Sequence, residues 1–313
     1  MSKLLLIDEE LAGKRLDKFL NHEFDISFGA IQKIIRQKQV KVNNQKVDAA
    51  HKLLAGDQIE IFCNLALRAK NSESKSQIRA TTISDFNIKK IISRIIYKDQ
   101  NLIAIDKPSG LSTQGGSGVD YSVDDLLKHL KFERTENPKL VHRLDRDTSG
   151  ILLIARNKQV AEMMFQIFKE KQIQKTYLAL VKGEFNKKSG IINIPIRKKF
   201  IGKNEKVYRD EIEGKEAITE YETIKNFTDI SLMKLKPITG RTHQLRVHCK
   251  ELGHPIINDV KYGGKEVIRK DIAKNMCLHA YKIEIDDYYG QKLVITTNVP
   301  DFAANFGFKA SNL

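Results

Sequence analysis

The residues best suited to chemistry are concentrated in two short segments. The first, residues 142–150, reads HRLDRDTSG and places Asp145 and Asp147 among arginines, directly before the apolar run 151–155. A loop that leads into a buried strand can hold a carboxylate rigidly at the edge of a cleft. A carboxylate in that position can serve as a nucleophile or as a base.

The second segment, residues 237–248, carries Arg241, His243 and Arg246 where a strand is expected to end and a helix to begin. Its arginines could pair with the aspartates of the first segment. A buried Asp–Arg pair would keep the carboxylate ionised at neutral pH. Arg–Asp pairs also stabilise loops without any catalytic role, so the two segments alone leave both interpretations open.

The sequence gives no sign of a metal or cofactor site. Cys63, Cys249 and Cys277 stand far apart, without the close pairing of a metal site or the pattern of a disulfide framework. His243 and His248 are five positions apart, so they do not share a helix face as zinc ligands four apart do. A glycine-rich stretch at 113–118 lacks the Lys-Ser/Thr ending of a nucleotide-binding loop. We therefore expect a reaction that needs neither group.

The charge of the chain indicates a polyanionic partner. The 313 residues carry a formal net charge of +15, and the isoelectric point is about 9.5. Nucleic acid is the commonest partner of a protein with such a positive charge. A generally lysine-rich proteome would give the same net charge. No apolar run approaches the roughly 20 residues of a membrane span, and the N-terminus lacks a signal-peptide pattern. We expect a cytoplasmic protein with no membrane association.

The elements that must position the two segments belong to a strand-rich region, residues 89–313. Helices are fewer than strands and do not alternate with them regularly, which favours an α+β domain on a mixed, mainly antiparallel sheet. Strands are predicted at 94–97, 102–105, 151–155, 176–181, 217–224 and 230–236, and helices at 123–130, 159–169 and 243–252.

Residues 1–65 are predicted to form a separate small unit, joined to the rest by a flexible polar linker at 66–88. Its first helix has apolar residues at helical spacing, and a second helix is expected to begin after Ser27. A strand at 40–42 should turn at two asparagines and return at 45–47, before a last strand at 58–62. The apolar faces of the helices are Leu16, Phe19, Leu20, Ile31, Ile34 and Ile35.

Two basic segments are candidates for RNA contact. Residues 33–46 contain no acidic residue, and a basic helix beside a basic turn suits the phosphate backbone of folded RNA. Residues 197–209 interleave cations with aromatic residues. An ordinary solvated face explains either pattern as well. The candidate contacts are Lys33, Arg36, Lys38, Lys41, Arg197, Lys198 and Lys199.

Several motifs together resemble those of a known family. The segments HRLDRDTSG, GRTHQLRVH and KPSG at 107–110 resemble the RluA family of pseudouridine synthases, most closely its RluC type. Residues 1–65 resemble the S4 (αL-type) RNA-binding domain. The resemblance spans nearly the whole chain, in the order that is typical of the family. One departure is Gln114, where close relatives tend to carry histidine.

The resemblance implies a role for each matching residue. Asp145 would be the catalytic carboxylate, and Arg143 would help to displace the target base and take its place. Tyr177, in the segment QKTYLA, would stack on that base. Arg246 would form a salt bridge with Asp145. No metal or cofactor takes part in the reaction that the family catalyses.

The implied activity is the isomerisation of specific uridines in 23S ribosomal RNA, by a monomer that flips its target base. A second interpretation is an S4 protein that binds RNA during ribosome assembly without catalysis. An RNA deaminase would need zinc-binding HxE and PCxxC motifs, which are absent. A methyltransferase would need a glycine-rich cofactor loop after an early strand, and none occurs.

Overall fold

The computed structural model describes residues 3–24, 28–63, 83–116, 119–201 and 204–309. They form two compact units that meet in sequence between residues 82 and 83, and each unit is described by itself. The predicted Ser27 cap and most of the predicted linker lie outside the described residues. In the described ranges no helix is long and apolar enough to span a membrane.

The first unit packs two helices on a small antiparallel sheet. Its helices are α1 (Leu16–Phe24) and α2 (Phe28–Arg36), and its strands β1 (Lys3–Leu6), β2 (Val40–Val42) and β3 (Gln58–Ile61) lie in the order β1-β3-β2. The helical spacing correctly predicted the buried positions, which exclude water from this unit and stabilise it. They are Leu16, Phe19, Leu20, Ile31, Ile34 and Ile35.

The turn after β2 differs from the prediction. Instead of a return strand at 45–47 there is a single bridge between Val42 and Gln45, and β2 pairs with β3. Asn43 explains the change, because its side-chain amide donates to Asp57 at 2.8 Å and its side-chain oxygen accepts from the Gln58 backbone N–H at 2.8 Å. These bonds join the turn to the start of β3.

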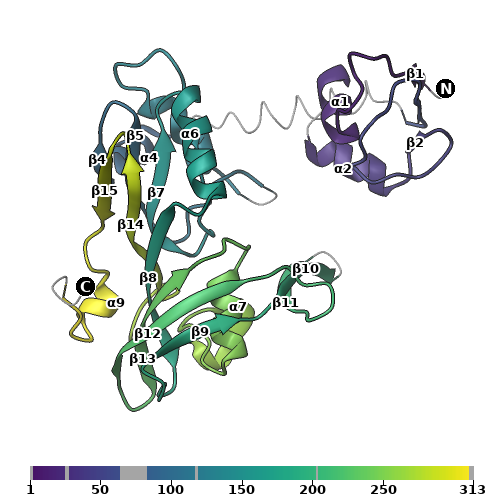
Figure 1. The fold of residues 1–313 in the computed structure, drawn as a ribbon. Helices are drawn as coiled ribbons and strands as arrows, with labels where there is room; N and C mark the ends of the chain where they lie inside the picture. The colour runs from purple at the N-terminus through teal and green to yellow at the C-terminus, as the bar shows by residue number, and fades with distance from the viewer. Residues whose placement is uncertain (1–2, 25–27, 64–82, 117–118, 202–203, 310–313) are drawn as a thin grey trace. The chain divides into compact units, whose positions relative to one another are not determined.

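The second unit is built on a ten-stranded mixed sheet in the order β4-β5-β7-β14-β8-β13-β12-β9, with β15 beside β14 and β6 beside β7 (Figure 1). Only the β7–β14 pair among the described strands is parallel, so the predicted α+β class and mainly antiparallel sheet are confirmed. The strands are β4 (Ile95–Lys98), β5 (Leu102–Lys107), β6 (Lys139–Leu140), β7 (Ser149–Ala155), β8 (Ile173–Lys182), β9 (Ser189–Asn193), β12 (Ile218–Asn226), β13 (Ile230–Pro237), β14 (Leu278–Tyr288) and β15 (Gln291–Thr296).

Alternate residues of β7 pack into two core layers. Ile151 and Leu153 face α6, whereas Leu152 and Ile154 face α4 and α5. Burial on both faces explains why this strand appears in the sequence as a continuous apolar run. The helical elements are α4 (Asp85–Ile92), α5 (Val123–Leu126), η1 (Leu127–Leu130), α6 (Lys158–Lys169), α7 (Gln244–Glu251), α8 (Val260–Gly263), η2 (Lys265–Val267) and α9 (Asp301–Ala304).

Helix α4 begins inside the range 66–88 that was predicted to be a linker. The hydroxyl of Ser84 caps the helix by accepting from the Asn87 backbone N–H, and Ile91 is buried in the core. The second unit therefore starts at Ile83, six residues before the predicted boundary at residue 89. An N-cap and a short apolar face were enough to fold a segment whose composition is polar.

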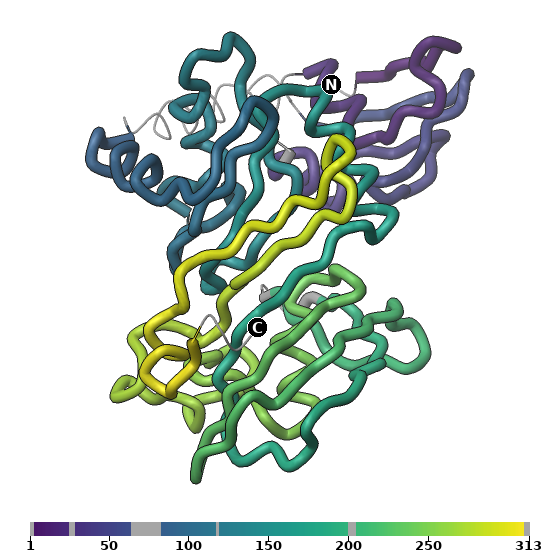
Figure 2. The backbone as a smooth tube through the Cα atoms, turned by 60° about the vertical axis from the view of Figure 1, so that its left-hand side comes forward, coloured from purple at the N-terminus to yellow at the C-terminus, as the bar shows by residue number. Residues whose placement is uncertain are grey.

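Strands β14 and β15 were not predicted, although β14 is central to the sheet. Figure 2 shows them as a long yellow hairpin between the blue and the green strands of this unit. The first four residues of β14 are all buried, and alternation of half-buried polar with buried apolar residues begins only at Lys282, so the start of the strand lacks an alternating pattern. The strands β10 (Ile196–Ile201) and β11 (Asn204–Arg209) form a separate two-stranded hairpin.

Candidate active site

The two ionisable segments face each other across a cleft of about 820 Å³ in the second unit. One wall carries the loop between β6 and β7, and another the start of α7. The strand β8 and the helix α6 also contribute. All four residues with predicted catalytic roles line this cleft: Arg143, Asp145, Tyr177 and Arg246.

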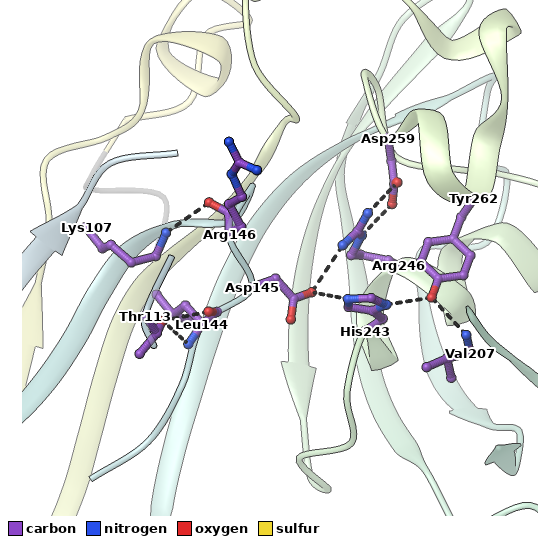
Figure 3. Close-up of polar contacts among 10 residues, drawn as sticks. All are labelled: Lys107, Thr113, Leu144, Asp145, Arg146, Val207, His243, Arg246, Asp259 and Tyr262. Atoms are coloured by element: carbon purple, nitrogen blue, oxygen red, sulfur yellow. Dashed lines mark hydrogen bonds and ion pairs between the residues drawn. The ribbon is translucent and has the colours of Figure 1, made fainter. Parts of the chain in front are cut away.

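Asp145 is held beside an arginine that is itself anchored by a second carboxylate (Figure 3). Arg246 reaches Asp145 with Nη1 at 3.4 Å from Oδ2, and donates from Nε and Nη2 to both oxygens of Asp259 at 2.8 and 2.7 Å. The Arg246 and Asp259 side chains are 5% and 1% exposed, whereas that of Asp145 is 25% exposed. The pair predicted between the two segments is therefore present, and Asp145 is its solvent-accessible member.

The pKa of Asp145 is raised above the ordinary value of an aspartate. Burial is the largest cause, and the negative charge of Asp259 acts in the same direction. The attraction and hydrogen bond of Arg246 and the more distant charge of Lys107 oppose the rise. Arg246 does lower the pKa of Asp145, as expected, but burial raises that pKa by more.

His243 contacts the same carboxylate and was not predicted to do so. It precedes α7 in a left-handed conformation, with φ of 55°, and its Nε2 lies 3.8 Å from Oδ2 of Asp145. Burial and the charge of Arg246 lower the pKa of His243 to about 3, so the imidazole is neutral at physiological pH. Its contact with Asp145 is therefore not an ion pair.

A hydrogen-bonded chain orients this imidazole (Figure 3). Nδ1 of His243 lies 2.6 Å from the hydroxyl of Tyr262, which accepts from the Val207 backbone N–H at 3.2 Å. The hydroxyl proton is then free to be donated to Nδ1, and this leaves the imidazole proton on Nε2, toward Asp145. The chain links the hairpin strand β11 to the carboxylate.

The backbone on either side of Asp145 is clamped by the segment that follows β5. The ammonium group of the fully buried Lys107 donates to the carbonyl of Arg146 at 3.2 Å. The hydroxyl of Thr113 donates to the Leu144 carbonyl at 2.7 Å and accepts from its N–H at 3.1 Å. Burial lowers the pKa of Lys107 to about 8, against the attraction of Asp145. The motif KPSG thus fixes the loop of the carboxylate.

Gly150 fixes the point at which that loop enters β7. Its φ is +105°, and a Cβ at this position would lie 2.2 Å from the carbonyl oxygen of Ala280 on β14. Only glycine allows the two strands to approach so closely. His142, at the start of the loop, accepts from the Leu153 N–H at 2.9 Å, and burial lowers its pKa to about 3.

Arg143 and Tyr177 lie in the cleft with different degrees of exposure. Arg143 is exposed at the surface of the loop. Tyr177 is half-buried on β8, paired with Leu235 on β13 and Ala280 on β14. Burial, together with the negative charge of Asp145, raises the pKa of Tyr177, so its ring is neutral and available as a flat apolar surface.

The basic residues predicted on the first unit are mostly at its surface. Lys33, Arg36 and Lys38 are exposed. Lys41 is half-buried and donates to the side-chain oxygen of Asn44 at 3.0 Å. Arg36 and Lys38 line a shallow groove of about 390 Å³.

The candidate cations on the hairpin are less available. Arg197 is paired with Glu213 and lies 3.5 Å from Asp210, and Lys198 is paired with Glu205. Lys199 is exposed and lies directly opposite Lys206 on the partner strand. Like charges in that position repel each other, and a bound anion would relieve the repulsion.

Four residues of the site had no predicted role: Asp259, Tyr262, His243 and Lys107. Asp259 and Tyr262 stand in a segment without any recognisable pattern. Lys107 had one signal, since a lysine that ends an apolar strand needs buried acceptors. Among the described residues, no three of histidine, cysteine, aspartate and glutamate gather as metal ligands do.

Comparison with known proteins agrees with this geometry. The family described as RNA pseudouridylate synthase matches residues 101–251, and the S4 domain matches residues 14–59. Ribosomal large subunit pseudouridine synthase C of Rickettsia felis is 40% identical over 293 residues, which cover 91% of this chain and 93% of that protein. The protein of the same name from Escherichia coli is 34% identical, covering 86% of this chain and 82% of its own.

Solved structures show the same fold. Human RNA pseudouridylate synthase domain containing 4 superposes with a TM-score of 0.59 at 25% identity, covering 70% of this chain and 93% of its own. Human RNA pseudouridylate synthase domain containing 1 gives 0.56 at 29% identity, covering 66% and 83%. The chain belongs to the RluA family of RNA pseudouridine synthases and carries an N-terminal S4 domain.

Proposed function

We propose that this enzyme isomerises specific uridines of 23S ribosomal RNA to pseudouridine, with Asp145 as its catalytic carboxylate. The observation that carries the proposal is the position of Asp145. It is a partly exposed carboxylate in a large cleft, beside a buried arginine and on a loop clamped at both neighbouring residues. The names of the two bacterial relatives support the substrate, since each is called a ribosomal large subunit pseudouridine synthase.

The chemistry requires only groups that the chain supplies. The N-glycosidic bond of uridine is broken, the base rotates, and a bond forms between C5 and the sugar. Asp145 would attack C1′ or remove a proton from the sugar, and in either role it must be ionised. The proton released from C5 must pass to solvent or to a basic group, and N1, freed from the sugar, must gain one proton, so that the atoms balance. No electron leaves or enters, since the reaction is an isomerisation.

The target base must leave the RNA stack before it can reach Asp145, at a cost of a few kcal/mol. Exposed Arg143 would enter the gap left by the base and offset part of that cost. Tyr177 would stack on the flipped uracil, since its half-buried ring presents a neutral face to the cleft. Arg246 would keep Asp145 oriented through the contact at 3.4 Å.

The remaining basic residues would bind the RNA outside the cleft. Lys33, Arg36, Lys38 and Lys41 would contact phosphates on the S4 unit, and Lys199 would do so on the hairpin. Arg197 and Lys198 would contribute less, because both already pair with carboxylates. We expect a monomer that works in the cytoplasm.

The decisive experiment compares the intact protein with Asp145→Asn on 23S RNA transcripts labelled at C5 of uridine. Asparagine preserves the size of the side chain but cannot act as a nucleophile or base, so hydrogen release should fall at least about 1,000-fold, as expected when an essential group is lost. RNA affinity should stay within about threefold. Equal release by both proteins would remove Asp145 from the mechanism. Binding without release by either protein would favour the S4 assembly factor.

A further inference from the structure

An exposed aromatic ring lies at the cleft, on the helix α6, without a role in the proposed chemistry. Phe165 is 61% exposed and lines the cleft together with Phe168 and Lys169 of the same helix. The opposite face of α6 faces the core through Val160, Met164 and Ile167, so Phe165 is not needed there. Its neighbour Phe168 packs on the His142 ring, with centroids 5.0 Å apart.

The surroundings of Phe165 are cationic. The described residues that line the cleft include five lysine or arginine residues and a single carboxylate, that of Asp145; the basic residues are Arg143, Lys169, Lys175, Arg241 and Arg246. Lys169 stands one turn beyond Phe165 and is also exposed. A positive groove with an exposed aromatic ring is the combination that binds single-stranded nucleic acid, because phosphates meet the cations and bases stack on the ring.

We propose that Phe165 is the stacking platform for an unpaired nucleotide next to the target uridine, with Lys169 binding its phosphate. This inference rests on the proposed function. A cleft of about 820 Å³ is near the upper end of the range of pockets for a small ligand, roughly 300–1,000 Å³. It leaves room for a base beside the one that reaches Asp145. Capture of the neighbour would keep the strand open while the target base is flipped.

Substitutions on α6 separate stacking from charge. Phe165→Ala should raise the Kd for target RNA by about 5- to 100-fold, as expected for one lost stack. The slope of log Kd against log salt should not change, because no phosphate contact is lost.

Lys169→Gln should instead make the slope of log Kd against log salt shallower, because it removes a phosphate contact. Phe165→Tyr should keep wild-type affinity, because tyrosine also has an aromatic ring. Phe165→Leu should bind RNA as weakly as Phe165→Ala, because leucine keeps only the apolar surface. Wild-type affinity of Phe165→Leu would show a merely apolar contact.

The chain contains no tryptophan, which allows a direct measurement. In a protein that also carries Asp145→Asn, the fluorescence of the indole introduced by Phe165→Trp should fall when target RNA binds, because stacked bases quench indole emission. Phe86→Trp is the matched control, since Phe86 is 71% exposed on α4 and does not line the cleft. Its emission should be unchanged.

An unchanged Kd for Phe165→Ala, or equal emission changes at both positions, would overturn the inference. Failure of the proposed function would look different, because the wild-type protein would then form no pseudouridine. A large loss of thermal stability in Phe165→Ala would also contradict the proposal, since it would show that the ring supports the fold.

Discussion

At the scale of residues, the site depends on how one arginine is shared by two carboxylates. Asp259 takes the two short bonds of Arg246, at 2.7 and 2.8 Å, and Asp145 receives the longer one at 3.4 Å. Charge-assisted bonds of full strength are about 2.7–2.9 Å long. Asp145 is thus oriented by the positive charge without being fully engaged by it, and its other acceptor positions stay available to the substrate.

The pKa of Asp145 predicts the acid limb of the pH–rate profile. In the proposed mechanism the reactive form of Asp145 is ionised, and burial favours the neutral form, so activity should fall as the pH drops through a value above the roughly 3.9 of a free aspartate. Arg246→Gln removes the main opposing charge and should move this limb to higher pH. Single-turnover rates measured across the acidic range test both statements, and a limb that stays in place would contradict them.

A paired variant controls for the fold. Arg246→Gln leaves the carboxylate of Asp259 buried and without its cation, which should cost about 3–5 kcal/mol of stability. Adding Asp259→Asn should recover most of that loss, as thermal unfolding would show. It also removes a negative charge near Asp145, so the acid limb should move partly back toward the wild-type position.

At the scale of elements, the parallel contact between β7 and β14 sets the position of the loop that carries Asp145. The two strands pair only at their first residues, where Ser149 and Gly150 oppose His279 and Ala280. A second link crosses the same point, because Ser149 Oγ lies 2.8 Å from Nδ1 of the buried His279. The carboxylate five residues before Gly150 is therefore anchored to the middle of the sheet.

Gly150→Ala should damage both stability and activity. The added methyl group meets the Ala280 carbonyl at 2.2 Å and imposes a conformation that side chains disfavour, so a loss of at least about 2 kcal/mol is expected. Gly290→Ala is the control, since its φ is +83° and its Cβ would have open space. It should show only the conformational cost in thermal unfolding. Equal losses for the two variants would disprove the close-contact argument.

For the molecule as a whole, we expect one unit to carry the chemistry and the other to add RNA affinity. The cleft belongs to the unit that starts at Ile83, as do Arg246 and His243, whose side chains contact Asp145. The first unit has a core of its own, formed by its helices and sheet. Its exposed lysines and arginine are proposed to contact RNA phosphates, which would make its contribution to binding depend on salt.

A chain that begins at Ile83 should therefore fold and keep its chemistry. Its Kd for 23S RNA should rise, and the slope of log Kd against log salt should become shallower by about one unit for each lost phosphate contact. The rate at saturating RNA should stay within about threefold. Circular dichroism is the control for folding. An unfolded product, or an RNA affinity equal to that of the full chain, would contradict separate roles for the two units.

Local features of this protein could be predicted from the sequence wherever burial repeats regularly along an element. The apolar spacing in residues 16–20 and 31–35 correctly indicated buried helix faces, and the run 151–155 indicated a strand buried on both sides. Such patterns are visible because burial repeats with the period of the element. The two ionisable segments around Asp145 and Arg246 were found for a similar reason, since each is dense and continuous.

The remaining residues of the site could be recognised only in the folded chain. Nothing in the local pattern around Asp259 and Tyr262 marks them, and Lys107 belongs to a motif whose contact with the Asp145 loop is seen only in the structure. The same holds for β14, whose first residues are buried on both faces and lack alternation. A sequence pattern shows which residues of one helix or strand are buried. Hydrogen bonds across a cleft depend instead on which strands are neighbours in the folded sheet.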